Sequence, residues 1–411
     1  MKIINIQGRE VFDAAGLPTL ACDITLANQL VFTGIAPSSS LPEPYAAVAR
    51  RDHQACWLGL GVQQAIDIIR TKILPVFLGL VPDGVQFDLK LIELDGTSDR
   101  TQLGANTMLA VSQAVFRAQA AADNMELFEL LALTCDHNQV TLPIPLVTLL
   151  QGAPVVGSPE YFAVPYGAKT VRQALERTVV LRECVRRVLA ANYGTVAQTA
   201  SGALVADFPQ LLAPLDCLLA AIELLPQVGD GLFAVGLNMA AAHYYQPSKQ
   251  LYQLPEQKLD RDSLLAWYIE LCSRYPIYLL AEGLAEHDWQ GWRKLVQALG
   301  PYVHIAANSL IASRPERLAY ALEQQAVGAV ILKPYQVGTV TETLQALKLA
   351  QEQGVMTIIT AGERETADAF IVDLAVGTNA THVQLGALNR GENVAKYNRL
   401  LEIEDFLLTG T

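Results

Sequence analysis

The sequence predicts an α/β protein in which a small α+β domain precedes a (β/α)8 barrel. Its 411 residues are too many for one small hydrophobic core, so two structural units are expected. The first forty residues have the composition of short strands, and two long helical patterns follow. Beyond about residue 140, roughly eight short apolar runs alternate with amphipathic helices, which is typical of parallel strands with crossover helices. That number of runs favours a closed barrel over an open sheet.

The predicted N-terminal domain begins with strands and continues with helices. The segment Lys2–Gln7 is short and apolar, and Thr19–Leu26 alternates between polar and apolar residues, with a turn at residues 16–18 between them. Apolar residues at spacings of three and four predict helices over Val62–Val76 and Ala105–Asn124.

A polar segment, Cys135–Val140, separates this domain from the next, and the proline-containing sequence from Leu142 to Pro145 follows it. We therefore predict an N-terminal domain over residues 1–134 and a barrel over residues 140–411.

The barrel prediction also locates the candidate site, because function in such barrels lies where strands run into loops at their carboxyl ends. Expected barrel strands are residues 232–239, 277–282, 302–308, 329–333 and 355–361. Their ends carry Asn238, Ala281, Glu282, Asn308, Lys333, Ala361 and Gly362, with Lys396 beyond the last strand. Two lysines and two asparagines should therefore converge, with few acids among them. Neither GxGxxG nor GxxxxGK[ST] follows a strand, so nucleotide fingerprints are missing.

Composition excludes several classes of protein. A net charge of −12 argues against a nucleic-acid-binding surface, which needs clustered Lys and Arg. No run of twenty apolar residues and no signal peptide occurs, so a cytoplasmic protein without a membrane anchor is expected. The six cysteines form no CxxC pair and are predicted to be free thiols. The six histidines show no HExxH spacing, so zinc is unsupported.

Several segments resemble enolases, in family order and over nearly the whole chain: residues 9–19, 94–114 (LDGTSDRTQLGANTMLAVSQA), 331–343 (ILKPYQVGTVTET), 370–377 and 385–404 (LGALNRGENVAKYNRLLEIE). This resemblance implies a small α+β domain, a modified (β/α)8 barrel and a homodimer. It also implies dehydration of 2-phosphoglycerate to phosphoenolpyruvate. That reaction removes a proton beside a carboxylate and needs a lysine base and two magnesium ions to stabilise the dianionic intermediate.

Some residues that the resemblance implies for catalysis are present. The family's base lysine corresponds to Lys333, and the lysine that helps bind the substrate carboxylate is assigned to Lys396 within AKYN. A glutamate near the leaving hydroxyl corresponds to Glu160.

The implied metal ligands are absent. The positions of the three barrel carboxylates hold Asn238, Ala281 and Asn308. Other family positions with catalytic or metal-binding side chains are occupied by residues without an ionisable group: Leu41, Ala203, Ala361 and Gly362. Magnesium prefers oxygen ligands that include charged carboxylates, and each lost attraction is worth roughly 4 kcal/mol at 4 Å and an effective dielectric of 20. We therefore expect no metal cofactor. Glu282 is not expected to rescue the site, because it follows Ala281 and neighbouring strand residues point to opposite faces.

Three functional hypotheses follow. The first is a degenerate, non-catalytic enolase homologue whose lysines, Lys333 and Lys396, form a metal-free cationic pocket for a small anion, such as a phosphorylated or carboxylate metabolite, or which acts by binding a protein. The second is an active enolase with rebuilt magnesium ligation. The third is a metal-free enzyme that uses the two lysines as an acid/base or imine-forming pair.

Overall fold

The computed structural model describes all residues except 39–42, 154–156, 226–232, 363 and 411. At the N-terminus, three antiparallel strands form a meander in the order β1-β2-β3. They are β1 (Ile3–Phe12), β2 (Pro18–Leu26) and β3 (Val31–Ile35). The β1–β2 turn is held by Asp13, whose Oδ1 accepts hydrogen bonds from the backbone N–H groups of Ala15 and Leu17, each at 2.9 Å. Both predicted strands are confirmed, and the first extends further along the chain than expected, to Phe12.

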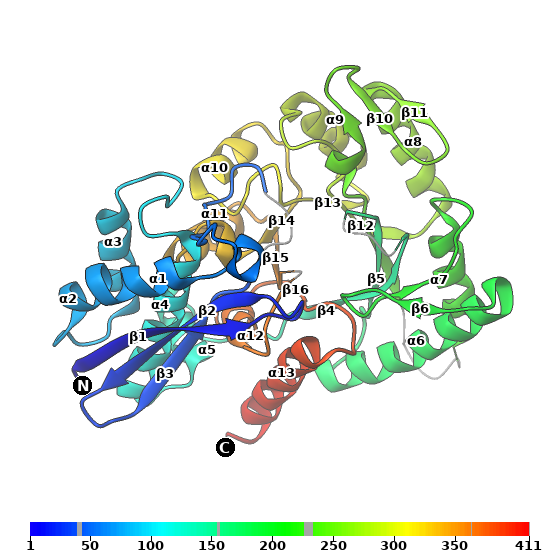
Figure 1. The fold of residues 1–411 in the computed structure, drawn as a ribbon. Coiled ribbons are helices and arrows are strands. Elements are labelled where there is room, and N and C mark those ends of the chain that lie inside the picture. The colour runs from blue at the N-terminus through cyan, green and yellow to red at the C-terminus, as the bar shows by residue number, and fades with distance from the viewer. Residues whose placement is uncertain (39–42, 154–156, 226–232, 363, 411) are drawn as a thin grey trace.

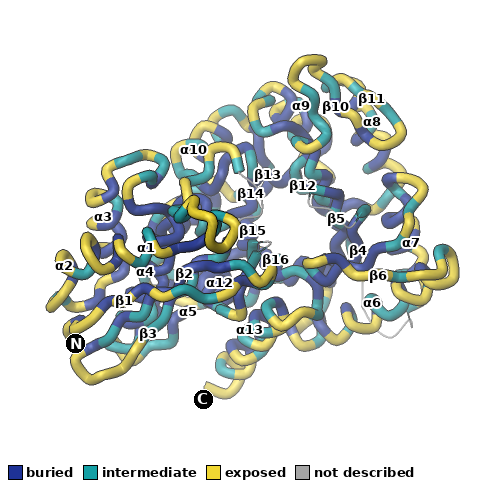
Figure 2. Tube along the Cα trace, in the orientation of Figure 1, coloured by how far each residue is buried: buried dark blue, intermediate teal, exposed yellow. Residues whose placement is uncertain are grey.

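Helices pack on this sheet, as the periodicity predicted. They are α1 (Gln63–Ile68), a π-helical turn η2 (Ile69–Ile73), α2 (Leu74–Phe77), α3 (Gly84–Asp95), α4 (Ala105–Ala122) and α5 (Leu127–Thr134), with a 3-10 turn η1 (Cys56–Gly59) before them. Helix α4 is buried along most of its length (Figure 2). It lies so close to β3 that a Cβ at Gly34 would stand 2.2 Å from the backbone oxygen of Ala110. Glycine at that position therefore allows the helix to approach the sheet.

The rest of the chain forms the barrel, which confirms the predicted fold class. In the described residues eight strands close it: β4 (Ile144–Gln151), β5 (Glu160–Val164), β8 (Ala234–Asn238), β12 (Ile277–Ala281), β13 (His304–Ala307), β14 (Ala329–Leu332), β15 (Met356–Thr360) and β16 (His382–Gln384). Pairing of β16 with β4 completes the ring. The barrel is modified, because β5 runs antiparallel to both β4 and β8 while the other neighbouring pairs are parallel.

Helices surround the strands (Figure 1). They are α6 (Val171–Tyr193), α7 (Ala213–Glu223), α8 (Arg261–Arg274), α9 (Trp289–Leu299), α10 (Pro315–Glu323), α11 (Val340–Glu352), α12 (Phe370–Gly377) and α13 (Gly391–Thr409). Short pieces lie in the loops: β6 (Ala197–Gln198), β7 (Leu204–Val205), η3 (Ala241–Tyr244), β9 (Tyr245–Gln246), β10 (Leu251–Gln253), β11 (Lys258–Leu259) and η4 (Pro334–Gln336). No helix within the described residues is both long and apolar enough to cross a membrane. All six cysteines are free.

Two apolar layers result from the alternation of side chains along the strands. One fills the inside of the barrel and includes Phe162, Leu279, Ala281 and Ile331. The other lies between the strands and the helices and continues into the N-terminal domain. The barrel interior is thus packed below its mouth, and open space is confined to the ends of the strands.

Charged groups join the N-terminal domain to the barrel. Arg117 of α4 binds Asp368 in two hydrogen bonds of 2.7 and 2.8 Å. Arg100 pairs with Glu342 of α11 at 2.6 Å, and Glu126 pairs with Arg399 of α13 at 2.8 Å. The Arg117–Asp368 pair is bidentate and the Arg100–Glu342 pair is largely buried, so these two fix the relative orientation of the domains better than an exposed pair would.

Asp88 is a further contact between the two parts, and it is fully buried. Its Oδ2 accepts hydrogen bonds from the backbone N–H and the hydroxyl of Thr341, at 2.9 and 2.7 Å, at the start of α11. Burial raises the pKa of Asp88 to about 7, against the opposing effect of those bonds. A raised pKa means that ionising this carboxyl in the folded protein costs stability.

We predict that Asp88→Asn stabilises the protein at neutral and alkaline pH. Stability of the wild type should fall as pH rises from about 4 through 7, because the unfolded carboxyl ionises first, whereas an amide keeps the acceptor and never ionises. The advantage of the variant should grow by roughly 4 kcal/mol between pH 4 and pH 8. Thermal unfolding of both proteins from pH 5 to pH 8 measures it. Asp123→Asn, an exposed aspartate, is the control, and an advantage that does not change with pH contradicts the prediction.

Candidate functional site

A cavity of about 400 Å³ opens at the carboxyl ends of the barrel strands, where the sequence analysis expected the site. Its walls include the carboxyl ends of seven barrel strands, or the residues that directly follow them, together with the start of the antiparallel β5: Gln151, Glu160, Asn238, Glu282, Asn308, Lys333, Thr360 and Gln384. A volume of this size is sufficient for a small metabolite.

Lys333 directly follows β14 and reaches the cavity, as predicted. Its backbone N–H donates to the hydroxyl of Ser313 at 2.8 Å, which fixes the chain where it leaves the strand. The Nζ atom lies 3.8 Å from a carboxylate oxygen of Glu43 and 5.8 Å from the centre of the Tyr335 ring. Lys333 is therefore already paired with an acid of the N-terminal domain.

Glu160 begins β5 and also lines the cavity. It stands opposite Asn238 in the antiparallel register of β5 and β8. The side-chain N–H of Asn238 donates to its Oε2 at 3.2 Å. The structure thus brings Lys333 and Glu160 to one cavity.

Lys396 does not belong to this cavity, and its predicted position at the rim is wrong. It lies inside α13 and is fully buried. Its Nζ donates to the backbone oxygens of Thr366 at 2.7 Å and Glu392 at 3.1 Å and pairs with Glu365 at 3.3 Å. The residue that ends the last strand and faces the cavity is Gln384. The hypothesis of a lysine pair acting on one ligand is accordingly not retained.

The three positions of the implied metal ligands do not fit magnesium. Asn308 is 5% exposed, and its amide is paired with the amide of Gln336 in both directions, each N–H···O distance being 3.0 Å. The Oδ1 of Asn238 accepts from the backbone N–H of Ala240 at 3.0 Å. Ala281 is packed inside the barrel and offers no ligand atom. Both amide oxygens are thus already engaged, and no negative charge balances a cation at these positions.

Glu282 faces the cavity, contrary to the expectation from strand alternation. Its φ of 52° takes the backbone out of the strand conformation directly after Ala281, so the alternation rule no longer applies. The carboxylate accepts hydrogen bonds from the backbone N–H groups of Asn308 at 2.6 Å and Ser309 at 3.2 Å. Burial raises the pKa of Glu282, while these bonds and Lys333 oppose the rise. Glu282 therefore caps the end of β13. This single carboxylate does not supply the three carboxylates that the resemblance implies for a metal site.

The lining is acidic, so the predicted cationic pocket is wrong. Lys333 is the one lysine or arginine among the described lining residues. Six glutamates accompany it: Glu43, Glu160, Glu282, Glu286, Glu365 and Glu392. They come from segments spread from the N-terminal domain to the last helix. No pattern in the sequence predicts that these glutamates lie in one cavity. Despite this number of acids, no group of three or more His, Cys, Asp or Glu side chains in the described part of the chain is arranged to hold a metal ion.

Other predicted positions can now be placed. Ala361 and Gly362 line the cavity, and the backbone N–H of Gly362 donates to Glu365 at 2.6 Å. Ala203 is fully buried, and the side chain of that segment which reaches the cavity is Ser201. Leu41 lies outside the described residues.

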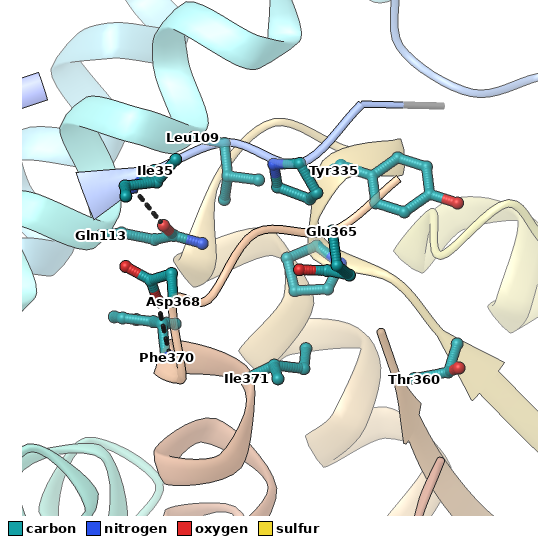
Figure 3. Close-up of a pocket in the computed structure, with 11 residues that line it drawn as sticks. Ile35, Leu109, Gln113, Tyr335, Thr360, Glu365, Asp368, Phe370 and Ile371 are labelled. Carbon is teal, nitrogen blue, oxygen red and sulfur yellow. Dashed lines mark hydrogen bonds between the residues drawn. The ribbon is translucent and has the colours of Figure 1, made fainter. Parts of the chain in front are cut away.

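Beside the main cavity is a void of about 20 Å³ between α4, β3 and the barrel, with room for about one water molecule. Tyr335 and Glu365 line both spaces. Figure 3 shows the Tyr335 ring at the edge of this void, with its phenolic oxygen directed away from Leu109 and Gln113. The void is thus packing space behind the site, and the hydroxyl of Tyr335 serves the main cavity.

Comparison with known proteins agrees with this architecture. Residues 3–131 match the family described as "Enolase, N-terminal domain", and residues 139–410 match "Enolase, C-terminal TIM barrel domain". The protein named "Enolase" from Acidothermus cellulolyticus is 35% identical over 99% of this chain and 95% of its own. Another named "Enolase", from a Nitratiruptor species, is 32% identical over 99% of this chain and 97% of its own. Together with the fold, these matches show that the chain is a member of the enolase family.

Proposed function

We propose that this enolase-family protein does not carry out magnesium-dependent dehydration and that its barrel cavity binds a small molecule without a metal. One observation carries the proposal: the side chain of Asn308 is joined to Gln336 through both its N–H and its oxygen. A residue at the position of a metal ligand is therefore committed to a hydrogen-bond network within the protein.

Charge balance supports the same conclusion. Removing a proton beside a carboxylate creates a dianion, which needs concentrated positive charge nearby. Lys333 is partly neutralised by Glu43 at 3.8 Å. Asn238, Ala281 and Asn308 add no charge that would hold two divalent cations. The family reaction thus lacks its electrostatic support, although the position of the base is retained.

An active enolase with rebuilt metal ligation is the alternative. Two relatives of at least 32% identity carry the name enolase, and Glu160 and Glu282 both face the cavity. Magnesium would then need ligands recruited from side chains that now bind backbone or amide groups. The two candidates differ in whether magnesium binds at all.

We predict that the purified protein shows no heat of binding for Mg²⁺ in the presence of 2-phosphoglycerate, and forms no phosphoenolpyruvate. Isothermal titration calorimetry and an assay of phosphoenolpyruvate measure the two quantities. Turnover that requires Mg²⁺, disappears with chelator and is lost in Lys333→Ala would establish the alternative.

A second prediction concerns Asn308→Asp. The carboxylate cannot donate to Gln336 or to the backbone oxygen of Ile331, which Asn308 contacts at 2.9 Å, so a buried charge faces two acceptors that have lost their donor. We expect a loss of roughly 2–4 kcal/mol in the free energy of unfolding, and no recovery on adding Mg²⁺. Urea unfolding measures the loss.

The control is Asn28→Asp, because the exposed Asn28 acts as an acceptor for the backbone N–H of Leu30 and a carboxylate retains that role. Equal stability of the two variants would show that the Asn308–Gln336 pair contributes little. Recovery of stability by Mg²⁺ in Asn308→Asp would show that a metal site is nearly complete.

A further inference from the structure

Glu43 occupies a position in the cavity that resembles that of a bound ligand. Three donors of the barrel converge on its carboxylate. The hydroxyl of Tyr335 donates to Oε1 at 2.7 Å, the side-chain N–H of Gln336 donates to Oε2, and the ammonium of Lys333 lies 3.8 Å from Oε1. A neutral donor on each oxygen together with a nearby cation is the arrangement by which proteins recognise a carboxylate.

The barrel holds the backbone that carries these donors, and the side chain of Gln336, in place independently of Glu43. All three belong to one segment, Lys333 and the 3-10 turn η4 that follows it. Gln336 is fully buried, and its amide is fixed by Asn308 and by the hydroxyl of Ser313, which donates to its oxygen at 2.5 Å. Preorganised donors lose little freedom when a ligand binds, so the subsite is suited to bind a carboxylate.

Glu43 comes from the other domain, on a turn that is itself anchored. The N–H of Ala46 donates to the backbone oxygen of Glu43 at 3.2 Å. Arg314 donates to the backbone oxygen of Tyr45 at 2.5 Å, and the guanidinium of Arg317 lies 3.6 Å from the centre of the Tyr45 ring. The side chain of Glu43 is 24% exposed and can rotate toward the cavity while the turn stays in place.

The charge of the cavity decides which ligand this subsite takes. Six glutamates line the cavity, and the three cations that pair with members of this set, Lys333, Lys396 and Arg390, leave an excess of negative charge. An additional anion is therefore repelled, and a doubly charged phosphate is repelled most. A carboxylate that replaces the carboxylate of Glu43 leaves the charge beside Lys333 unchanged. An anion therefore enters the cavity with the smallest electrostatic free-energy cost when its carboxylate takes the place of the Glu43 carboxylate.

We propose that Lys333, Tyr335 and Gln336 form a carboxylate-binding subsite, that Glu43 fills it from within the chain, and that a small monocarboxylate binds by displacing Glu43. This inference rests on the proposed metal-free binding function and specifies its ligand class. Glu43 acts as an internal competitor, so the apparent affinity is lowered by the fraction of molecules in which it is bound.

The test measures binding of acetate and of inorganic phosphate by calorimetry at constant ionic strength, using the full chain. Glu43→Ala should bind acetate at least about tenfold more tightly than the wild type, because the competitor is removed. Glu43→Gln should show a smaller gain, since the amide still accepts from Tyr335. Adding Lys333→Met to Glu43→Ala should abolish the gain.

The matched control is Glu286→Ala, which removes another glutamate of the same cavity and so reports any gain from reduced negative charge alone. Equal acetate affinity in Glu43→Ala and Glu286→Ala overturns the inference. A gain for phosphate as large as that for acetate does so as well. Thermal unfolding checks that each variant is folded. If Glu43→Ala does not fold, the acetate affinity of Glu43→Gln is compared with that of the wild type instead. Magnesium-dependent formation of phosphoenolpyruvate is measured separately, so failure of the proposed function is recognised independently of the acetate result.

Discussion

Closure of the barrel by the pairing of β16 with β4 is the constraint on which the site depends. It places residues from both ends of a long segment, Gln384 and Gln151 among them, at one opening. Because the interior below is filled by apolar side chains, whatever follows each strand determines the chemistry of the mouth. The fold therefore forms a cavity at this mouth whichever side chains follow the strands.

The barrel and most residues at its mouth could be predicted from the sequence, because short apolar runs mark the strands and therefore also where each strand ends. Such runs predict Lys333 and Asn308 at strand ends, and both lie at the opening. Lys396 was misplaced for a physical reason. The last strand has three residues, His382–Gln384, and is too short to show periodicity. The resemblance therefore assigned the lysine of the AKYN segment, which lies in the helix after this strand. Burial of that lysine is made tolerable by two backbone oxygens and Glu365.

The acidity of the cavity could not be predicted, for two different reasons. Glu282 reaches the opening because a left-handed backbone conformation interrupts the alternation of its strand. Glu43 reaches it because an N-terminal turn packs against a distant part of the chain, at Tyr335 and Gln336 of the barrel. Neither a local conformational exception nor a contact between domains is encoded in the spacing of apolar residues.

The amides of Asn238 and Asn308 explain how this part of the cavity can be stable without a cation. Three clustered carboxylates repel one another unless a cation lies between them, so an empty site of that kind lowers the stability of the protein. An asparagine carries both a donor and an acceptor, and Asn308 uses them on the complementary atoms of Gln336. Gln336 can then direct a further N–H at Glu43. The hydrogen bonds that satisfy Asn308 within the protein therefore also orient the Gln336 amide, one of the donors in the proposed carboxylate subsite.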